Sequence, residues 1–167
     1  FNYDYGLINY LLSLFGISAI NWLNNPAYNL AALIIYSVWS MLPFTIILLL
    51  AGFQNVDPQY YTAARVDGAK SSKIFFRITL PLLAPTIGLT TIINMISASK
   101  VFTELFPLFN GKPGSAYSLY TVVYYLYDMF YAQWKLGKAA ASAIILFLIV
   151  LILTLIQLRI QRKWKNY

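Results

Sequence analysis

The sequence predicts an all-α membrane protein with about three spanning helices, short cytoplasmic helices and outer interfacial helices. Of its 167 residues, 60% are hydrophobic and only 10% are charged, whereas soluble domains are about 45–50% apolar and about 25% charged. Mean hydropathy is +0.65, and several long runs carry no charge. The 14 tyrosines are typical of chains whose aromatic rings lie at bilayer interfaces.

The charges exclude several classes of function. A net charge of +7 would suggest nucleic acid for a soluble domain, but here the basic residues lie beside apolar runs, which favours membrane topology and no nucleic acid. The sequence has no His, no Cys and five acidic residues. We therefore expect no catalytic residues and no metal site. Because the chain begins at Phe1 without Met or a signal peptide, we also expect further sequence upstream.

The first element after the N-terminal segment is a span. Residues 1–29 have a short apolar helix pattern followed by turn formers, which predicts an outer interfacial segment. Residues 30–51 form an uncharged run of about 33 Å as a helix, enough to cross about 30 Å of hydrocarbon. Pro43 lies in the middle of this run. It indicates either a simple kink or a local opening of the backbone that shapes a pathway.

The next segment, residues 52–79, is polar and is predicted to be a cytoplasmic loop. Asp57 followed by Pro58 is typical of a helix start, with Asp as N-cap and Pro at the first helical position. A short helix to about Val66 should follow, and the Asp-Gly pair after it should end that helix.

A second short helix is expected after the Asp-Gly pair. Ser71 or Ser72 can cap it, and "KIFFRITL" then leads toward the membrane. The stretch 62–64 offers a surface of small side chains to which another backbone can come close. The segment is either an ordinary loop or a helical hairpin that docks into a partner, and the two capped helices favour the hairpin.

The second predicted span, residues 80–101, is unusually polar. Prolines 81 and 85 should fall in its first turns. Such a helix is expected to pack against other helices or to face a wet cavity rather than lipid. Its polar side chains are Thr90, Thr91, Asn94, Ser97 and Ser99.

The remaining segments complete the predicted topology. Residues 102–138 are expected to be an outer loop and an aromatic interfacial helix containing Asp128, and Lys100 and Glu104 should form an ion pair. Residues 139–160 form the third span, and residues 161–167 a cytoplasmic tail. Eight basic residues then lie on the side of the polar loop and tail, and four on the other side, which places the loop and tail in the cytoplasm. These residues are Arg65, Lys70, Lys73, Arg77, Arg159, Arg162, Lys163 and Lys165, against Lys100, Lys112, Lys135 and Lys138.

The polar loop carries a recognisable motif. The stretch "YYTAARVDGAKSSKIFFRITLPLLAPTI" resembles the EAA loop of ABC-importer permeases, whose pattern is E-A-A-x-x-D-G-A followed by I-x-L-P. The positions that match are Ala63, Ala64, Asp67, Gly68, Ala69, Ile78, Leu80 and Pro81.

Other segments follow the order of the sugar-permease branch of this family. These are "GLINYLL", "NWLNNPAYNLAALIIYSVW", "LAGFQNVDPQYY", "FNGKPG" and "LGKAAASAIILFLI". The resemblance implies the C-terminal portion of a type I ABC-importer transmembrane domain in a bacterial-type cell membrane. A permease for a non-sugar solute is the alternative. A membrane enzyme is disfavoured by the lack of His and Cys, and a channel needs no docking hairpin.

The resemblance also implies partners and a division of labour. A second permease subunit, with a heterodimer expected, two cytoplasmic ATPases and an extracytoplasmic binding protein would complete the importer. ATP and magnesium would be bound by the ATPases, because this chain has no phosphate-binding loop motif. The substrate would be a sugar of di- or oligosaccharide size, and the outer surface of the spans would contact lipid.

Site residues follow from the resemblance and from the chemistry of the spans. The residues expected to couple to the ATPase are Thr62, Ala63, Ala64, Asp67, Gly68 and Ala69. Thr62 stands where the family has Glu, so a carboxylate for an ATPase arginine is missing there, and the turn reads Gly-Lys-Pro-Gly instead of Gly-Gly-Pro. Because sugars need aromatic faces and neutral polar groups, the candidate pathway residues are Trp39, Ser40, Phe44, Asn94, Ser97 and Ala98. Helix packing is the alternative role for each.

Overall fold

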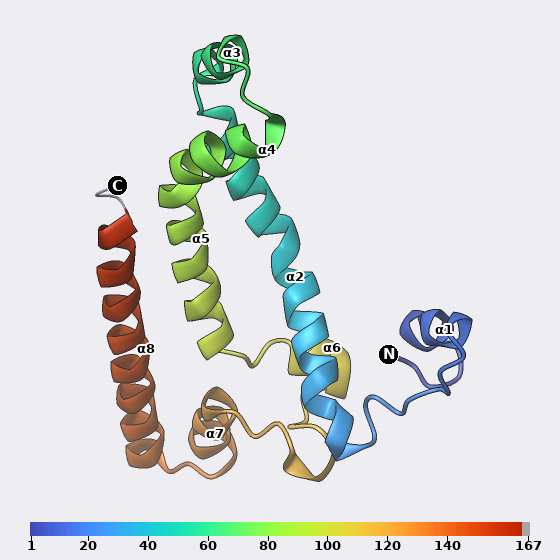
Figure 1. Ribbon diagram of the computed structural model, residues 1–167. Coiled ribbons are helices and arrows are strands. Elements are labelled where there is room, and N and C mark those ends of the chain that lie inside the picture. The colour runs from blue at the N-terminus through green and yellow to red at the C-terminus, as the bar shows by residue number, and fades with distance from the viewer. Residues whose placement is uncertain (165–167) are drawn as a thin grey trace. The chain divides into compact units, whose positions relative to one another are not determined.

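The computed structural model describes the backbone of residues 1–164 and the side chains of residues 1–161. Every regular element in that range is helical (Figure 1). The chain divides into two compact units, and each is described by itself. Unit 1 comprises Phe1–Ser40 and Ala98–Ile149, and unit 2 comprises Met41–Ser97 and the chain from Val150 onward.

Three helices are long and apolar enough to cross a membrane, as the sequence predicts. They are α2 (Pro26–Gln54), the continuous helix Ser71–Ser99, and α8 (Leu136–Trp164), which qualifies over Leu136–Gln161. The continuous helix consists of α4 (Ser71–Ile74), the π-helical η1 (Phe75–Thr79) and α5 (Leu80–Ser99). The predicted fold class, all-α with about three spans, is therefore confirmed. The side chains of Arg162 and Lys163, and all of Lys165, lie outside the described residues.

The start of the second long helix differs from the prediction. The helix begins at Ser71, so the prolines lie well inside it rather than in its first turns. Neither serine caps it: the N-cap is Lys70, with no hydrogen bond from its side chain. In a regular α-helix the ring of Pro81 would meet the carbonyl of Arg77, four residues earlier. The wider π-helical turn of η1 falls on this stretch and accommodates the ring.

Helix α2 runs unbroken through Pro43. Proline has no N–H, so the carbonyl of Trp39 lacks its usual partner four residues on. The boundary between the two units falls next to this point, between Ser40 and Met41. The turn of α2 that lacks this hydrogen bond thus lies next to the boundary between the two units.

Unit 1 contains the short helix before α2 and the short helices between α5 and α8. They are α1 (Leu7–Leu14), α6 (Leu105–Phe109), η2 (Ser115–Tyr117), α7 (Val122–Tyr127) and η3 (Asp128–Ala132). A buried apolar cluster joins α2 to α6 and to the turn that follows α6. Its members are Leu33, Leu105, Phe109 and Leu119. Helices α7 and η3 together are about 17 Å long, too short to span a bilayer.

Glu104 does not form the ion pair that the sequence predicts. Its carboxylate accepts a hydrogen bond from the backbone N–H of Phe102 at 3.1 Å and one from the Thr103 hydroxyl at 3.3 Å. Because α5 ends at Ser99, Lys100 and Glu104 do not lie one helical turn apart. The carboxylate therefore stabilises the turn before α6 instead of pairing with Lys100.

Unit 2 joins the C-terminal half of α2 to α5 and carries α3 (Pro58–Val66) beyond the end of α2 (Figure 1). The Asn94 amide donates to the Thr45 hydroxyl at 3.0 Å, which links α5 to α2. Thr90 and Thr91 donate back to carbonyls of their own helix. The polar residues of this span are thus satisfied partly by a neighbouring helix and partly by their own backbone.

Candidate functional site

The polar hairpin in unit 2 begins with a well-formed helix start. Asp57 is the N-cap of α3, and its carboxylate accepts from the backbone N–H of Gln59 at 2.8 Å. Pro58 occupies the first helical position, where its missing N–H costs nothing. The start and the end of α3 both fall where the sequence predicts them, because local capping chemistry decides both.

The end of α3 is a Schellman motif centred on Gly68. The N–H of Ala69 bonds to the carbonyl of Ala64 at 2.9 Å, and the N–H of Gly68 bonds to the carbonyl of Arg65 at 3.0 Å. Gly68 has φ +71°, a left-handed conformation that side chains with a Cβ adopt only at a cost. The turn that redirects the chain from α3 to Ser71 therefore depends on this glycine.

The exposed surface of α3 differs from the small-residue surface that the sequence suggests. Thr62 and Ala63 are exposed, but Ala64 is buried, with only 8% of its surface accessible. Val66, by contrast, is 83% exposed. The Thr62 hydroxyl donates to the carbonyl of Pro58 at 3.3 Å, so it is turned back along the helix. The outward face of α3 thus presents Thr62, Ala63 and Val66.

The inward face of α3 is attached to the neighbouring helices of unit 2. The hydroxyl of Thr79, which is buried, donates to the Tyr61 hydroxyl at 3.3 Å. The rings of Phe53 and Tyr61 lie 6.3 Å apart. Helix α3 is therefore held both to the end of α2 and to the start of the long helix that contains Thr79.

The candidate pathway residues lie on α2 and α5 and are divided between the two units. Trp39 is 67% exposed and Phe44 is 54% exposed, and Ser40 is exposed beside Pro43. On α5, Ser97 is half-buried and Ala98 is exposed. Trp39, Ser40 and Ala98 belong to unit 1, and Phe44, Asn94 and Ser97 to unit 2.

An apolar groove of about 770 Å³ lies between α5 and α8 in unit 2. Its walls include Phe76, Leu80, Ile87 and Ile160. Gln161 donates to the carbonyl of Pro85 at 3.3 Å. Because both helices are candidate spans, the groove belongs to the apolar part of the chain and not to the hairpin.

The sequence reasoning missed Asn29, which is fully buried in the first turns of α2 in unit 1. With its amide oriented to satisfy its neighbours, the oxygen accepts from the hydroxyls of Ser115 and Ser118, each at 2.7 Å, and from the N–H of Ser115 at 2.8 Å. The nitrogen donates to the carbonyls of Trp22 and Leu23 at 3.0 and 3.1 Å. We call this set of bonds the Asn29 clasp.

The Asn29 clasp joins three segments that are distant in the sequence: the loop before α2, α2 itself and the turn after α6. Nothing local distinguishes Asn29 from the other asparagines of "NWLNNPAYN". Its partners lie 86 and 89 residues away. Only the tertiary contact identifies it, so a single sequence carries no signal that could have found it.

A second polar cluster surrounds Asp128 in unit 1. The Tyr120 hydroxyl donates to the carboxylate at 2.6 Å, and the Gln133 amide donates to it at 2.9 Å. The bond to Asp128, together with partial burial, raises the pKa of Tyr120 to about 12. Burial, followed by the charge of Asp128, also raises the pKa of Tyr124. The carboxylate thus holds the neighbouring phenols in their neutral form.

Replacing Asp128 with Asn should lower the pKa of Tyr120 toward the ordinary 10.0. The raised pKa means that the folded state favours the neutral phenol. This stabilisation is present below about pH 10 and is lost as the pH rises through about 12. The measurement is the absorbance of phenolate as a function of pH, recorded for the variant and for the unmodified protein and compared as a difference between the two curves. The control is Asp4→Asn, because the Asp4 carboxylate makes no hydrogen bond in the described residues. An unchanged titration in Asp128→Asn would show that Asp128 does not raise the pKa of Tyr120.

These observations define the class of protein: a helical membrane component with a capped hairpin between two candidate spans. The family of binding-protein-dependent transport system inner membrane components matches residues 6–166. The chain belongs to this family and so to the permease subunits of an inner membrane, which are not themselves catalytic.

Curated relatives support this assignment. The chain is 38% identical over 97% of its length to a trehalose/maltose transport system permease protein, MalF, of Thermococcus litoralis. It is 34% identical over 96% of its length to the arabinooligosaccharides transport system permease protein AraP of Bacillus subtilis. It covers 54% and 51% of those two proteins. The chain therefore spans about half the length of the relatives that it matches.

A solved structure matches the fold. It is a bacterial ABC transporter involved in the import of the acidic polysaccharide alginate, with a TM-score of 0.78 and 26% identity. The match covers 96% of this chain and 56% of that one. A second structure of a bacterial alginate ABC transporter, with a pentasaccharide-bound periplasmic protein, gives the same TM-score of 0.78 at 25% identity.

Proposed function

We propose that this chain is part of a permease subunit of an ATP-driven, binding-protein-dependent importer for sugars, of di- or oligosaccharide size. The observation that carries the proposal is the hairpin of α3 and Gly68, capped at both ends and leading directly into a 29-residue candidate span. The named relatives that transport trehalose or maltose and arabinooligosaccharides support a sugar as the substrate. A permease for a non-sugar solute is the alternative.

The proposed mechanism couples ATPase movement to the spans through this hairpin. The exposed residues Thr62, Ala63 and Val66 would lie in a cleft of a cytoplasmic ATPase, and Asp67 would provide the negative charge at the turn. Tyr61 and Thr79 tie α3 to the start of the long helix. Because no break separates Ser71 from Ser99, displacement of the hairpin would move the whole helix.

The other parts of the importer follow from the same proposal. A second permease subunit, expected to be different from this one, would complete the pathway. Two ATPase subunits would bind ATP and magnesium, and an extracytoplasmic protein would deliver the sugar. The basic hairpin would face the cytoplasm, as the distribution of Lys and Arg favours.

The pathway itself would draw on α2 and α5. Trp39 and Phe44 present aromatic faces that no other part of the described chain covers fully. Ser40 and Ala98 are exposed, and Ser97 is half-buried. Asn94 would act indirectly, because its amide already bonds to Thr45 and links the two helices.

The test is a bulky substitution on the exposed face of α3. We expect Ala63→Trp to abolish co-purification of the full-length permease with its ATPase and to remove sugar-stimulated ATP hydrolysis in proteoliposomes. Ala63 is the better site than Ala64, because Ala64 is buried and its replacement would disturb the hairpin itself. Ala27→Trp, an exposed position at the start of α2, is the control.

Three outcomes are informative. Loss of both signals in Ala63→Trp but not in Ala27→Trp supports the proposal. Retention of both in Ala63→Trp would overturn the coupling role of α3. In a third experiment, the binding protein is titrated with candidate sugars. If ATP hydrolysis depends on the binding protein but no sugar stimulates it, the transported solute is not a sugar.

A further inference from the structure

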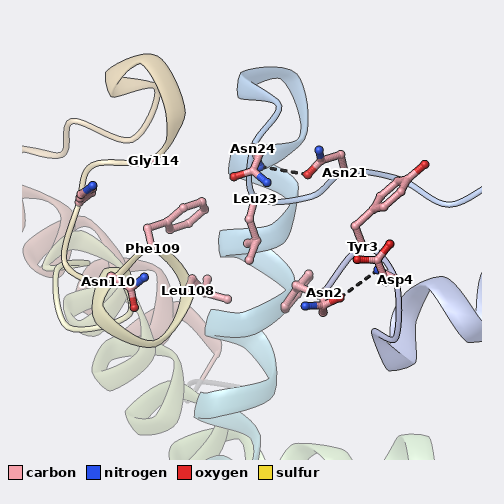
Figure 2. A pocket seen from close by; sticks show the side chains of 12 residues that line it. Asn2, Tyr3, Asp4, Asn21, Leu23, Asn24, Leu108, Phe109, Asn110 and Gly114 are labelled. Atoms are coloured by element: carbon pink, nitrogen blue, oxygen red, sulfur yellow. Dashed lines mark hydrogen bonds between the residues drawn. The ribbon is translucent and has the colours of Figure 1, made fainter.

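A polar pocket of about 430 Å³ lies in unit 1, separate from the hairpin (Figure 2). Three segments form it: the N-terminal residues 1–4, the loop 21–24 before α2, and the end of α6 with the turn 108–114. Its volume falls in the range of about 300–1,000 Å³ that is usual for small-molecule sites. None of its lining residues belongs to the candidate coupling or pathway sites.

The pocket presents side-chain amides that the protein does not use. The oxygen of Asn2 accepts from the N–H groups of Asp4 and Tyr5, and the oxygen of Asn21 accepts from the N–H of Asn24. These bonds leave the NH₂ groups of Asn2 and Asn21 without a partner in the described residues. The side-chain amides of Asn24 and Asn110 form no hydrogen bond there either, so both a donor and an acceptor remain on each.

Part of the pocket surface is apolar. Leu23, Leu108 and Phe109 line it (Figure 2), and all three pack in or against the buried cluster of unit 1. Tyr3 adds an aromatic ring that is 51% exposed. The pocket therefore combines a fixed apolar surface with neutral hydrogen-bonding groups around it.

Hydrogen bonds from buried side chains hold the segments that form the pocket. The buried Asn9 amide donates to the carbonyls of Tyr3 and Ile20 at 3.1 and 3.0 Å, and its oxygen accepts from the indole of Trp22 at 2.8 Å. The Asn29 clasp holds the turn after α6. A pocket whose walls are held in this way loses little conformational entropy when a ligand binds.

The charge of the pocket selects the kind of ligand. Of the side chains that line it, only those of Asp4 and Lys112 are charged, with opposite signs, so the side chains offer no excess charge to an anion or a cation. Unused amides pair with hydroxyl groups as both donors and acceptors. The apolar part of the surface suits the C–H faces of a pyranose or furanose ring. A neutral sugar has both features.

We propose that this pocket is an outer sugar-binding subsite, which holds one ring of a neutral saccharide by Asn24, Asn110 and Tyr3. The inference rests on the proposed function, because it takes the sugar as the transported solute. The topology predicted from the sequence, with residues 1–29 and 102–138 on the outer side, places the pocket outside the cell membrane. The subsite would receive sugar at the outer face before it enters the spans.

The test uses a single cysteine as a local probe, since residues 1–167 contain none. Lys112→Cys, at an exposed lining residue that is not one of the three proposed to hold the sugar, is introduced into the full-length permease complex, in a background without other cysteines, and labelled with a membrane-impermeant maleimide. The sugars are maltose, lactose and raffinose, together with whichever sugar stimulates ATP hydrolysis with the binding protein. At twice the Kd, a sugar should slow labelling about threefold.

Two further variants make the test specific. Asn110→Gly removes an amide from the pocket and suits the left-handed backbone there, where φ is +52°; it should abolish the protection of Lys112→Cys. Tyr5→Cys, 84% exposed and not part of the pocket lining, should be labelled equally fast with and without sugar.

The outcomes separate this inference from the proposed function. If sugar-loaded binding protein stimulates ATP hydrolysis but no sugar protects Lys112→Cys, the subsite is overturned and the importer stands. If sugar protects the cysteine but none stimulates hydrolysis, the subsite stands and sugar import does not. Protection by the binding protein without sugar would show a protein-docking surface and would overturn the subsite.

Discussion

Replacing Asn29 with Ala should destabilise unit 1 more than any other polar truncation in that unit. The variant leaves the carbonyls of Trp22 and Leu23 without the donor they now have, and it removes the acceptor for Ser115 and Ser118. Each unsatisfied buried group costs about 1–3 kcal/mol. Water entering the site and rotation of the hydroxyls should recover part of this cost, so we expect a net loss of about 3 kcal/mol. The measurement is the thermal unfolding of the purified permease complex.

Asn24→Ala is the matched control, because Asn24 lies in the same region but is exposed and makes no side-chain hydrogen bond in the described residues. It should leave the unfolding temperature nearly unchanged. Asn29→Asp should also destabilise, because a carboxylate cannot donate to the two carbonyls. Equal unfolding temperatures for Asn29→Ala and Asn24→Ala would show that the Asn29 clasp does not stabilise this region.

Replacing Gly68 with Val should uncouple ATP hydrolysis from transport. The φ of +71° at Gly68 is a genuine outlier for a β-branched residue, and the strain amounts to at least about 1–2 kcal/mol. The surroundings of Gly68 offer no steric obstacle, since no atom beyond its two neighbours in the chain lies within 4 Å of an added Cβ. The expected defect therefore comes from the backbone: the Schellman motif should open, and α3 should lose its direction. Transport per ATP hydrolysed, measured in proteoliposomes, reports the effect.

Two substitutions test that backbone explanation. Gly68→Asn should be much milder than Gly68→Val, because asparagine tolerates the left-handed conformation. Gly137→Ala, in the helical part of α8 with no atom near the added Cβ, should be neutral or slightly stabilising. If Gly68→Asn and Gly68→Val impair coupling equally, the role of Gly68 does not depend on its φ.

The elements that local chemistry decides could be read from the sequence. The Asp-Pro start of α3 and its end at Val66 fall where capping rules place them, and the three long apolar helices contain all or most of each span that hydropathy predicts. The resemblance to the permease family rests on the same kind of local signal, a motif of consecutive residues. Each of these features depends on residues within a few turns of one another.

Some local expectations failed because a neighbouring segment changed the outcome. The helix that Ser71 or Ser72 was expected to cap begins at Ser71 itself, has Lys70 as its N-cap and continues into the span. Ala64 belongs to the motif but is buried, because Tyr61 and its neighbours attach that face of α3 to the rest of unit 2. Glu104 bonds to the turn before α6 and not to Lys100, because the helix that would align them ends at Ser99.

Composition, hydropathy and the capping pattern were thus enough to show an all-helical membrane protein with a polar hairpin, and the resemblance of the hairpin motif indicated the permease family. The tertiary structure alone revealed the Asn29 clasp and the amide-lined pocket. Their members come from segments up to 89 residues apart, and a hydrogen bond between such segments depends on how the chain packs. Neighbouring residues determine where a helix begins and ends. Which distant residue a side chain bonds to is determined only when the segments fold against each other.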